Sequence, residues 1–204
     1  MIDENTWYWV RDQSLAIAAR NAGFDLAVYN DYSAIVQDEL RKRAIKTAID
    51  EIRMAFDAQT EAELSEITQG VYVISLAAPL TLQYKNKTSD VIYIGMGNII
   101  SRIESHFNNS LFDFMQSLSG AEFDFRFAKP KLPYHTDYYK HVEYLMLDYF
   151  ERSAGSLPIL NSNAGNNRNI KNDDDWWVRP LWGNGRRPRW TLTALPDSGF
   201  RSLD

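Results

Sequence analysis

Five side chains of unlike chemistry lie at spacings that could assemble a phosphate-handling site. Glu143 carries a hard carboxylate oxygen, the ligand type that Mg²⁺ and Mn²⁺ prefer. Arg102 offers a planar cation that matches phosphate, and His106, four residues later, would project from the same face of a helix. Tyr72 and Tyr93 are phenols with a usual pKa of about 10, so a nearby cation would have to lower that pKa before either acts as a base. These groups suit hydrolysis of a phosphodiester bond.

The same residues fall into short motifs in a fixed order. The series is Gly70-Val71-Tyr72, Tyr93-Ile94-Gly95, Arg102-x-x-x-His106, Glu143 and Pro158-Ile159-Leu160-Asn161. In this order it resembles the GIY-YIG endonuclease superfamily over about residues 70–161, with Val in place of the middle Ile of the first half. The 21-residue spacing from Tyr72 to Tyr93 is longer than in the shortest family members, so residues 77–90 are expected to form a loop between two strands.

The resemblance implies a role for each residue. Tyr72 is the leading general-base candidate, and Tyr93 would position the water or the scissile phosphate. Glu143 would be the ligand of Mg²⁺ or Mn²⁺, and Arg102, His106 and Asn161 complete the expected catalytic set. The segment 153–157 lengthens the path from Glu143 to Asn161, so Asn161 fits the family pattern less closely than Glu143 does.

Each residue taken alone also has an ordinary interpretation. Tyrosines in strands are usually half-buried packing residues, and a helical arginine or histidine usually faces water. Glu143 could simply form an ion pair with Lys140 or Arg152, and an asparagine after a proline is a common turn residue. Only the co-occurrence of these residues in one order favours a functional site.

The elements that would position these residues can be predicted from hydrophobic periodicity. Residues 70–76, 91–95 and 122–128 are short, β-branched or aromatic strands, and Phe123, Phe125 and Phe127 alternate with charges as in a half-buried strand. Asn98 is a credible helix N-cap before the apolar stripe of Ile99 or Ile100, Ile103 and Phe107. A further helix should begin near Thr136 and end before Gly155. We therefore predict an α+β fold, with a small three-stranded, mainly antiparallel sheet flanked by helices.

The first third of the chain, residues 1–69, is predicted to be a helical extension. Its apolar stripe recurs every three to five residues, at Ile35 or Val36, Leu40, Ile45, Ile49, Ile52 and Phe56. Thr60 and Glu63 form a T-x-x-E capping box that predicts a second short helix there. We divide the chain into this extension, a core of residues 70–161 and a C-terminal part of residues 162–204.

Composition narrows the classes of function. The 204 residues include no cysteine, which excludes a thiolate nucleophile, a disulfide framework and a cysteine zinc site. The formal net charge of −5 argues against a protein that coats nucleic acid. That acidity is concentrated in residues 1–69, where 13 acidic residues face 7 basic ones. No run approaches the roughly 18 apolar residues of a membrane helix, so we expect no membrane contact and a cytoplasmic protein.

The C-terminal part contains a second candidate nucleic-acid surface. Residues 176–190 hold four tryptophans and four arginines without an acidic residue, a local charge of +4. Such a mixture suits phosphate contact and base stacking. The candidate DNA-binding residues are Arg179, Arg186, Arg187, Arg189, Trp182 and Trp190. Alternatively, the tryptophans close the core or a dimer interface.

The leading hypothesis is a metal-dependent endonuclease that cuts double-stranded DNA, possibly as a homodimeric restriction-type enzyme. The alternative is a catalytically silent or partner-regulated GIY-YIG module, such as a toxin or defence effector. In that case the acidic N-terminal helices would bind a protein partner.

Overall fold

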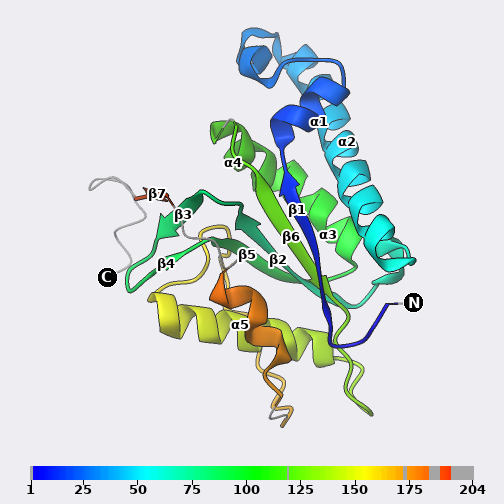
Figure 1. Ribbon diagram of the computed structural model, residues 1–204, viewed down its shortest axis with the longest axis vertical. Helices are drawn as coiled ribbons and strands as arrows, with labels where there is room; N and C mark the ends of the chain where they lie inside the picture. Colours follow the sequence, from blue (N-terminus) through cyan, green and yellow to red (C-terminus); the bar gives the residue numbers. More distant parts are fainter. Residues whose placement is uncertain (1, 119, 172–173, 184–188, 194–204) are drawn as a thin grey trace.

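A four-stranded antiparallel sheet forms the centre of the computed structural model, which describes residues 2–118, 120–171, 174–183 and 189–193 (Figure 1). The strand order is β1-β6-β2-β5. Its strands are β1 (Trp7–Gln13), β6 (Phe123–Ala128), β2 (Gly70–Leu76) and β5 (Val91–Gly97). The mixed α+β class is confirmed, but the prediction of three strands is wrong, because a strand from the N-terminal third completes the sheet.

Strand β1 was missed because the N-terminal residues look polar and acidic as a whole. Within them, WYWVRDQ is short and rich in aromatic and β-branched side chains, which favour a strand. Trp7 pairs with Ala128 and Val10 with Phe125, so β1 covers the outer edge of β6. The N-terminal third is therefore not wholly helical.

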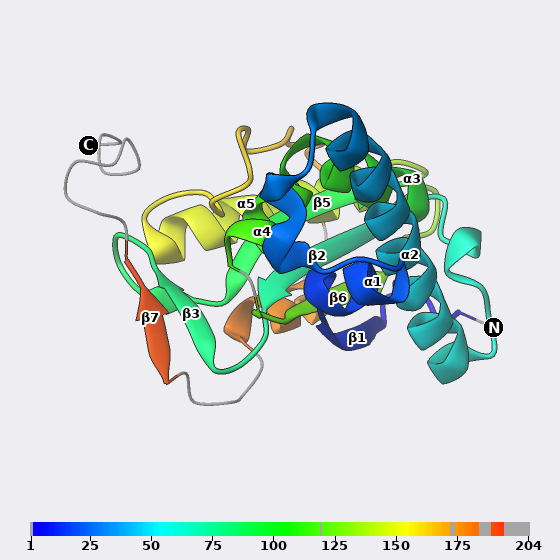
Figure 2. The ribbon, with the colours of Figure 1, turned by 90° about the horizontal axis from the view of Figure 1, so that it is seen from above.

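The two faces of the sheet are covered by different helices (Figures 1 and 2). On one face, Phe56 packs edge-on to Phe127, and Phe107 stacks with Phe125. These contacts come from α2 (Ala34–Thr60) and from the π-helical turn η3 (Phe107–Leu111), which continues α3 (Ile99–His106) into α4 (Phe112–Ser117). The other face carries α5 (Tyr138–Ala154) and the 3-10 helix η4 (Trp176–Trp182).

Several helix predictions are confirmed in detail. The Asn98 side chain accepts a hydrogen bond from the Ser101 backbone N–H, as expected of an N-cap. The α2 stripe from Leu40 to Phe56 is buried, whereas Ile35 is 85% exposed and Val36 is also exposed. These two residues begin the helix beyond the edge of the core, so the stripe is shorter than predicted.

The predicted capping box at Thr60 and Glu63 is wrong. Thr60 is the last residue of α2, and its hydroxyl donates to the Phe56 carbonyl. The capping box lies three residues later, where Glu63 and Glu66 cap the short 3-10 helix η2 (Leu64–Glu66) reciprocally. The Thr60 hydroxyl accepts from the Ala62 N–H at 3.4 Å, whereas a capping box would use the N–H of Glu63.

A second, smaller sheet occupies the region predicted as a loop. Residues within 77–90 form the hairpin of β3 (Leu80–Gln83) and β4 (Thr88–Ser89), and β7 (Trp190–Leu192) adds to β3 in parallel. The prediction of an irregular connection is therefore wrong here.

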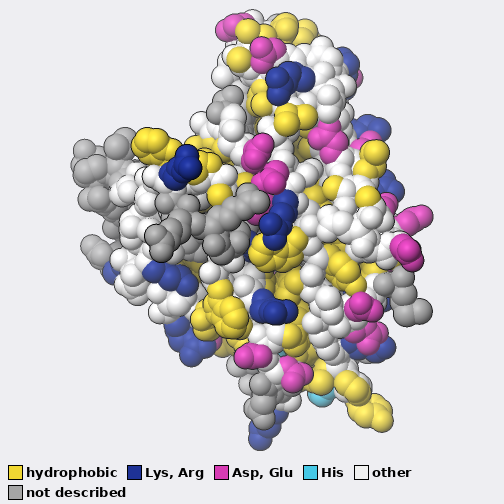
Figure 3. All heavy atoms as spheres, viewed as in Figure 1, with side chains coloured by type: hydrophobic (Ala, Val, Ile, Leu, Met, Phe, Trp, Pro, Cys, Tyr) yellow, Lys and Arg dark blue, Asp and Glu magenta, His cyan; other side chains and the backbone are white. Residues whose placement is uncertain are grey.

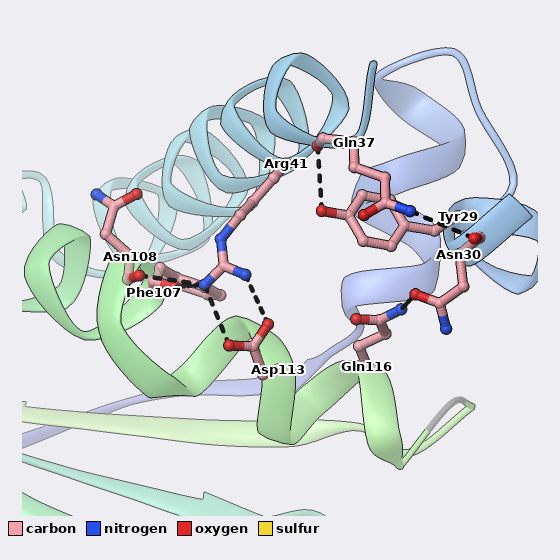
Figure 4. Close-up of polar contacts among 8 residues, drawn as sticks. All are labelled: Tyr29, Asn30, Gln37, Arg41, Phe107, Asn108, Asp113 and Gln116. Carbon is pink, nitrogen blue, oxygen red and sulfur yellow. Dashed lines mark hydrogen bonds and ion pairs between the residues drawn. The ribbon is translucent and has the colours of Figure 1, made fainter. Parts of the chain in front are cut away.

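The N-terminal helices are bound to the rest of the molecule by polar contacts (Figure 4). Besides α2, they comprise α1 (Leu15–Asn21) and the 3-10 helix η1 (Leu26–Asp31). Arg41 of α2 forms an ion pair with Asp113 of α4 at 2.6 Å and donates to the carbonyls of Phe107 and Asn108. Gln116 donates to Asn30 of η1 at 3.0 Å. The extension therefore packs directly on η3 and α4.

Candidate active site

Two tyrosines from neighbouring strands form the floor of the candidate site. Tyr72 of β2 and Tyr93 of β5 are both buried, and their ring centroids lie 5.7 Å apart. Tyr72 pairs directly with Gly95. A Cβ at Gly95 would lie 2.7 Å from the Tyr72 hydroxyl oxygen and 2.5 Å from the Tyr93 ring. Glycine is thus required at this position for both phenols to fit.

His106 packs on these rings from α3. Its ring centroid is 4.0 Å from that of Tyr93 and 6.0 Å from that of Tyr72. Its Nε2 atom is buried and makes no hydrogen bond within the described part of the chain. Burial and the neighbouring Arg102 lower the pKa of His106 to about 4. The imidazole is therefore neutral at pH 7.

Arg102 lies one helical turn before His106 and interacts with both phenols. Burial lowers the pKa of Arg102, but the neighbouring Tyr72 and Tyr93 raise it more, so the guanidinium stays charged. Gly97 has a φ of +124°, and a Cβ there would lie 3.2 Å from the Arg102 Cγ. A glycine at the end of β5 thus leaves room for the stem of the arginine.

The phenols themselves are held in their neutral form. Burial raises the pKa of Tyr72 well above its usual value, Tyr93 adds to the rise, and Arg102 opposes it. Burial also raises the pKa of Tyr93. Although Arg102 and Tyr93 are near, the Tyr72 hydroxyl makes no hydrogen bond of regular geometry within the described residues. A buried hydroxyl whose hydrogen bonding is incomplete is a candidate for a functional role.

Glu143 approaches the same cluster from α5. Burial raises the pKa of Glu143 to about 7, and Arg102 opposes the shift. Its suggested ion-pair partners are engaged elsewhere: Lys140 pairs with Asp137 at 2.8 Å, and Arg152 pairs with Asp148. Within the described residues, neither suggested partner therefore forms an ion pair with Glu143.

Asn161 lies beside the cluster but uses its side chain on backbone. Its carbonyl oxygen accepts from the Ile94 N–H at 2.9 Å, and its amide donates to the Ile94 carbonyl at 2.8 Å. The Leu160 N–H donates to the Ile92 carbonyl at 3.0 Å. Residues 160–161 thus line the outer edge of β5 and hold the strand that carries Tyr93, which makes Asn161 a positioning residue in this geometry.

Some of the C-terminal tryptophans and arginines are exposed, as a nucleic-acid-binding surface requires, and others pack against the core. Trp182 and Trp190 are 66% and 67% exposed, as a stacking surface would need. Trp176 and Trp177 instead pack against Trp7 and Tyr149. Arg179 and Arg189 are exposed, whereas Arg186 and Arg187 lie outside the described residues. On the face in Figure 3, basic side chains are interspersed with acidic and hydrophobic ones.

One charged residue escaped the sequence analysis. Arg126 of β6 is fully buried, 3.5 Å from Asp90 and stacked 4.2 Å over the Trp9 ring, and it donates to the Pro180 carbonyl. The alternation in β6 predicts a polar, solvated face, but η4 covers that face, so all six residues of the strand are buried. Only the tertiary fold reveals this.

A metal would have to rely on Glu143 at this site. Within the described residues, no three histidine or acidic side chains gather into a metal-binding group. A single carboxylate still fits Mg²⁺, which keeps several waters and takes further ligands from a substrate phosphate. Glu143 has the right donor chemistry, because its carboxylate offers the hard oxygen ligands that Mg²⁺ prefers. Burial disfavours the negative charge of this half-buried carboxylate, and Arg102 offsets that effect only in part.

Comparison with known proteins identifies no relative of this chain. No family model, curated protein or solved structure matches the chain. Over the described ranges, no helix is both long and apolar enough to cross a membrane.

Proposed function

We propose that this protein is a metal-dependent endonuclease that hydrolyses phosphodiester bonds of DNA. The observation that carries the proposal is the convergence around Arg102. Its charge affects the pKa values of Tyr72, Tyr93, His106 and Glu143, which come from β2, β5, α3 and α5. Residues up to 71 positions apart in the chain thus form one cluster, and they are the residues that the motif order had singled out.

In this proposal, Arg102 binds the scissile phosphate, and Glu143 holds Mg²⁺ or Mn²⁺. The cation, when bound, would stabilise negative charge on the phosphoryl oxygens. Tyr93 orients the phosphate or the attacking water. Tyr72 is the candidate acceptor of the proton of that water, which requires its pKa to fall from its present high value. The charge of Arg102 already acts in that direction.

The proposal is tested by incubating the purified protein with plasmid DNA and Mg²⁺ or Mn²⁺. We expect cleavage by the wild-type protein and at least a hundredfold loss with Arg102→Ala or Glu143→Gln. Arg20→Ala is a matched control, because Arg20 is an exposed helical arginine on α1. Cleavage that is equally fast in the Arg102 and Glu143 variants would refute the site assignment.

A partner-regulated or silent module is the second candidate. It is favoured by apolar side chains that remain exposed on the acidic N-terminal helices, namely Ile17, Val28, Tyr32, Ile35 and Val36. A protein partner could cover them and restrain the cluster. Toxicity on overexpression that Arg102→Ala abolishes would support an active nuclease over a silent module. It would leave restriction and defence roles equally open.

A further inference from the structure

A polar loop runs along α5 beside the candidate site and is held at both ends. At its start, Asn161 makes its two hydrogen bonds to the Ile94 backbone. At its end, Ile170 packs against the core, and its backbone lies beside His141. Residues 162–169 between these two points are all exposed. The loop is thus fixed in place while its middle remains open to a ligand.

The middle of this loop lies directly over the candidate carboxylate. A Cβ at Gly165 would be 3.7 Å from the Glu143 carboxylate oxygen Oε2 and 3.4 Å from the Tyr144 Cα. Gly165 has a φ of +73°, a left-handed conformation that glycine adopts without strain. A substrate that reaches Glu143 therefore also meets the loop.

The composition of residues 162–169 matches one class of ligand. They include four asparagines and Arg168 but no acidic residue, in a protein of net charge −5. Asparagine amides pair with base edges, adenine above all, and arginine binds phosphate or guanine. Asn163 and Asn167 make hydrogen bonds within the loop, and Asn166 and Arg168 are exposed. Lys140 and, to a smaller extent, Arg168 lower the pKa of Asp137, so the charge of Arg168 lies near the start of α5.

We propose that residues 162–169 form a wall that contacts double-stranded DNA next to the bond being cut. Arg168 contacts a backbone phosphate, and Asn166 contacts a base edge, so the loop contributes to sequence preference. This inference rests on the proposed function, since it places the loop against the substrate of that site. No bond is made or broken by the loop itself.

The test separates binding from cleavage. Binding of labelled duplex fragments is measured with Glu143→Gln protein at several salt concentrations, with and without Arg168→Ala. Loss of one phosphate contact should weaken binding and reduce the slope of log affinity against log salt by about 1. Arg20→Ala in the same background is the control for loss of an exposed arginine, and it should leave the slope unchanged.

The base contact is tested with Asn166→Ala in the otherwise wild-type protein. Cut positions on plasmid DNA are mapped by sequencing the fragment ends, and the base composition beside each cut is compared with that of the wild type. A relaxed preference at one position supports the proposal. Thermal unfolding of each variant must match the wild type, as expected for exposed residues.

Failure of the loop proposal is distinct from failure of the proposed function. If the wild type cuts DNA while both loop variants show its salt slope and its cut positions, the loop proposal is overturned and the nuclease assignment stands. If the wild type cuts no DNA and the Glu143→Gln protein binds no duplex, both are overturned.

Discussion

The hydroxyls of the buried residues Tyr84 and Tyr72 differ in their hydrogen bonding. The Tyr84 hydroxyl donates to the Val91 carbonyl at 2.6 Å and accepts from the Ile159 N–H at 3.2 Å. The Tyr72 hydroxyl is buried near Tyr93 and Arg102 but makes no hydrogen bond of regular geometry within the described residues. We expect Tyr84→Phe to lower the free energy of unfolding by about 1–3 kcal/mol, and Tyr72→Phe to leave it unchanged or raise it by up to about 1 kcal/mol. Urea unfolding measures both values.

The same pair of variants separates stability from chemistry. Under the proposed function, Tyr72→Phe should reduce cleavage at least a hundredfold in a protein that is no less stable. Tyr84→Phe should cleave normally below its unfolding midpoint. Equal losses of stability in the two variants would show that the Tyr72 hydroxyl has a structural partner.

Glu143 should make stability depend on pH in a direction unusual for a carboxylate. Its pKa is about 7 in the folded protein, against a usual value of 4.5. The folded state therefore holds the proton more tightly, so this stabilisation is present below pH 4.5 and is lost as pH rises through 7. We expect Glu143→Gln to exceed the wild type in unfolding free energy by about 2 kcal/mol at pH 8, and the difference to shrink towards pH 5.

The comparison must be between variant and wild type because His106 acts in the opposite direction. Its pKa of about 4 lies below the usual 6.5, so its contribution is lost as pH falls through 4. Saturating Mg²⁺ gives a further check, because it should stabilise the wild type at pH 8 more than Glu143→Gln. A stability difference that does not change between pH 5 and pH 8 would contradict the environment assigned to Glu143.

At the level of elements, Asn161 acts on the free edge of β5. Its two hydrogen bonds to Ile94 replace those that another strand would make. We expect Asn161→Ala to destabilise the protein by about 1–3 kcal/mol and to speed amide hydrogen exchange at Ile94. Asn161→Asp tests the geometry, since its second carboxylate oxygen would face the Ile94 carbonyl and should be at least as harmful. Unchanged exchange at Ile94 in both variants would exclude the edge role.

Gly95 provides a second test at the level of the strands. In Gly95→Ala, the added methyl group must displace the Tyr72 hydroxyl or the Tyr93 ring, both of which lie within 2.7 Å. We expect a loss of about 1–3 kcal/mol from overpacking and a larger proportional loss of cleavage. The matched variant is Gly120→Ala, where no atom of the described residues beyond its chain neighbours lies within 4 Å of the added Cβ, although its φ of +87° adds some strain. Tyrosine fluorescence and the cleavage rate should change only in the Gly95 variant.

The order of the motifs in the sequence predicted which side chains would lie together in the candidate site. It did not predict how deeply these side chains are buried or which elements cover them. The strands that carry Tyr72 and Tyr93, and the cap at Asn98, follow local rules of period and capping, so they were predictable. Strand β1 and the buried Arg126 were not. The pairing of β1 with β6 and the cover of η4 over β6 are tertiary events. The pKa shifts of Glu143 and Tyr72 depend on burial, which no spacing reveals.

On the scale of the whole molecule, residues 1–69 belong structurally to the core. They supply the edge strand β1 and the Phe56 ring that packs on Phe127, and Arg41 ties α2 to α4. We expect a fragment of residues 70–204 to aggregate, because the β6 edge and a phenylalanine-rich face would be exposed. Size-exclusion chromatography and circular dichroism report this outcome. A monomeric fragment with a cooperative unfolding transition would show that the core folds alone.

The position of β1 also has a consequence for how the protein is made. Strand β1, Trp7–Gln13, leaves the ribosome well before its partner and can pair only when Phe123–Ala128 has been synthesised. All the residues between these two strands must be synthesised before the sheet closes. Pairings between such distant segments slow folding, because a long loop has to close before they form. During synthesis the nascent chain therefore carries an unpaired aromatic strand, and such an exposed strand edge is prone to aggregate until its partner arrives.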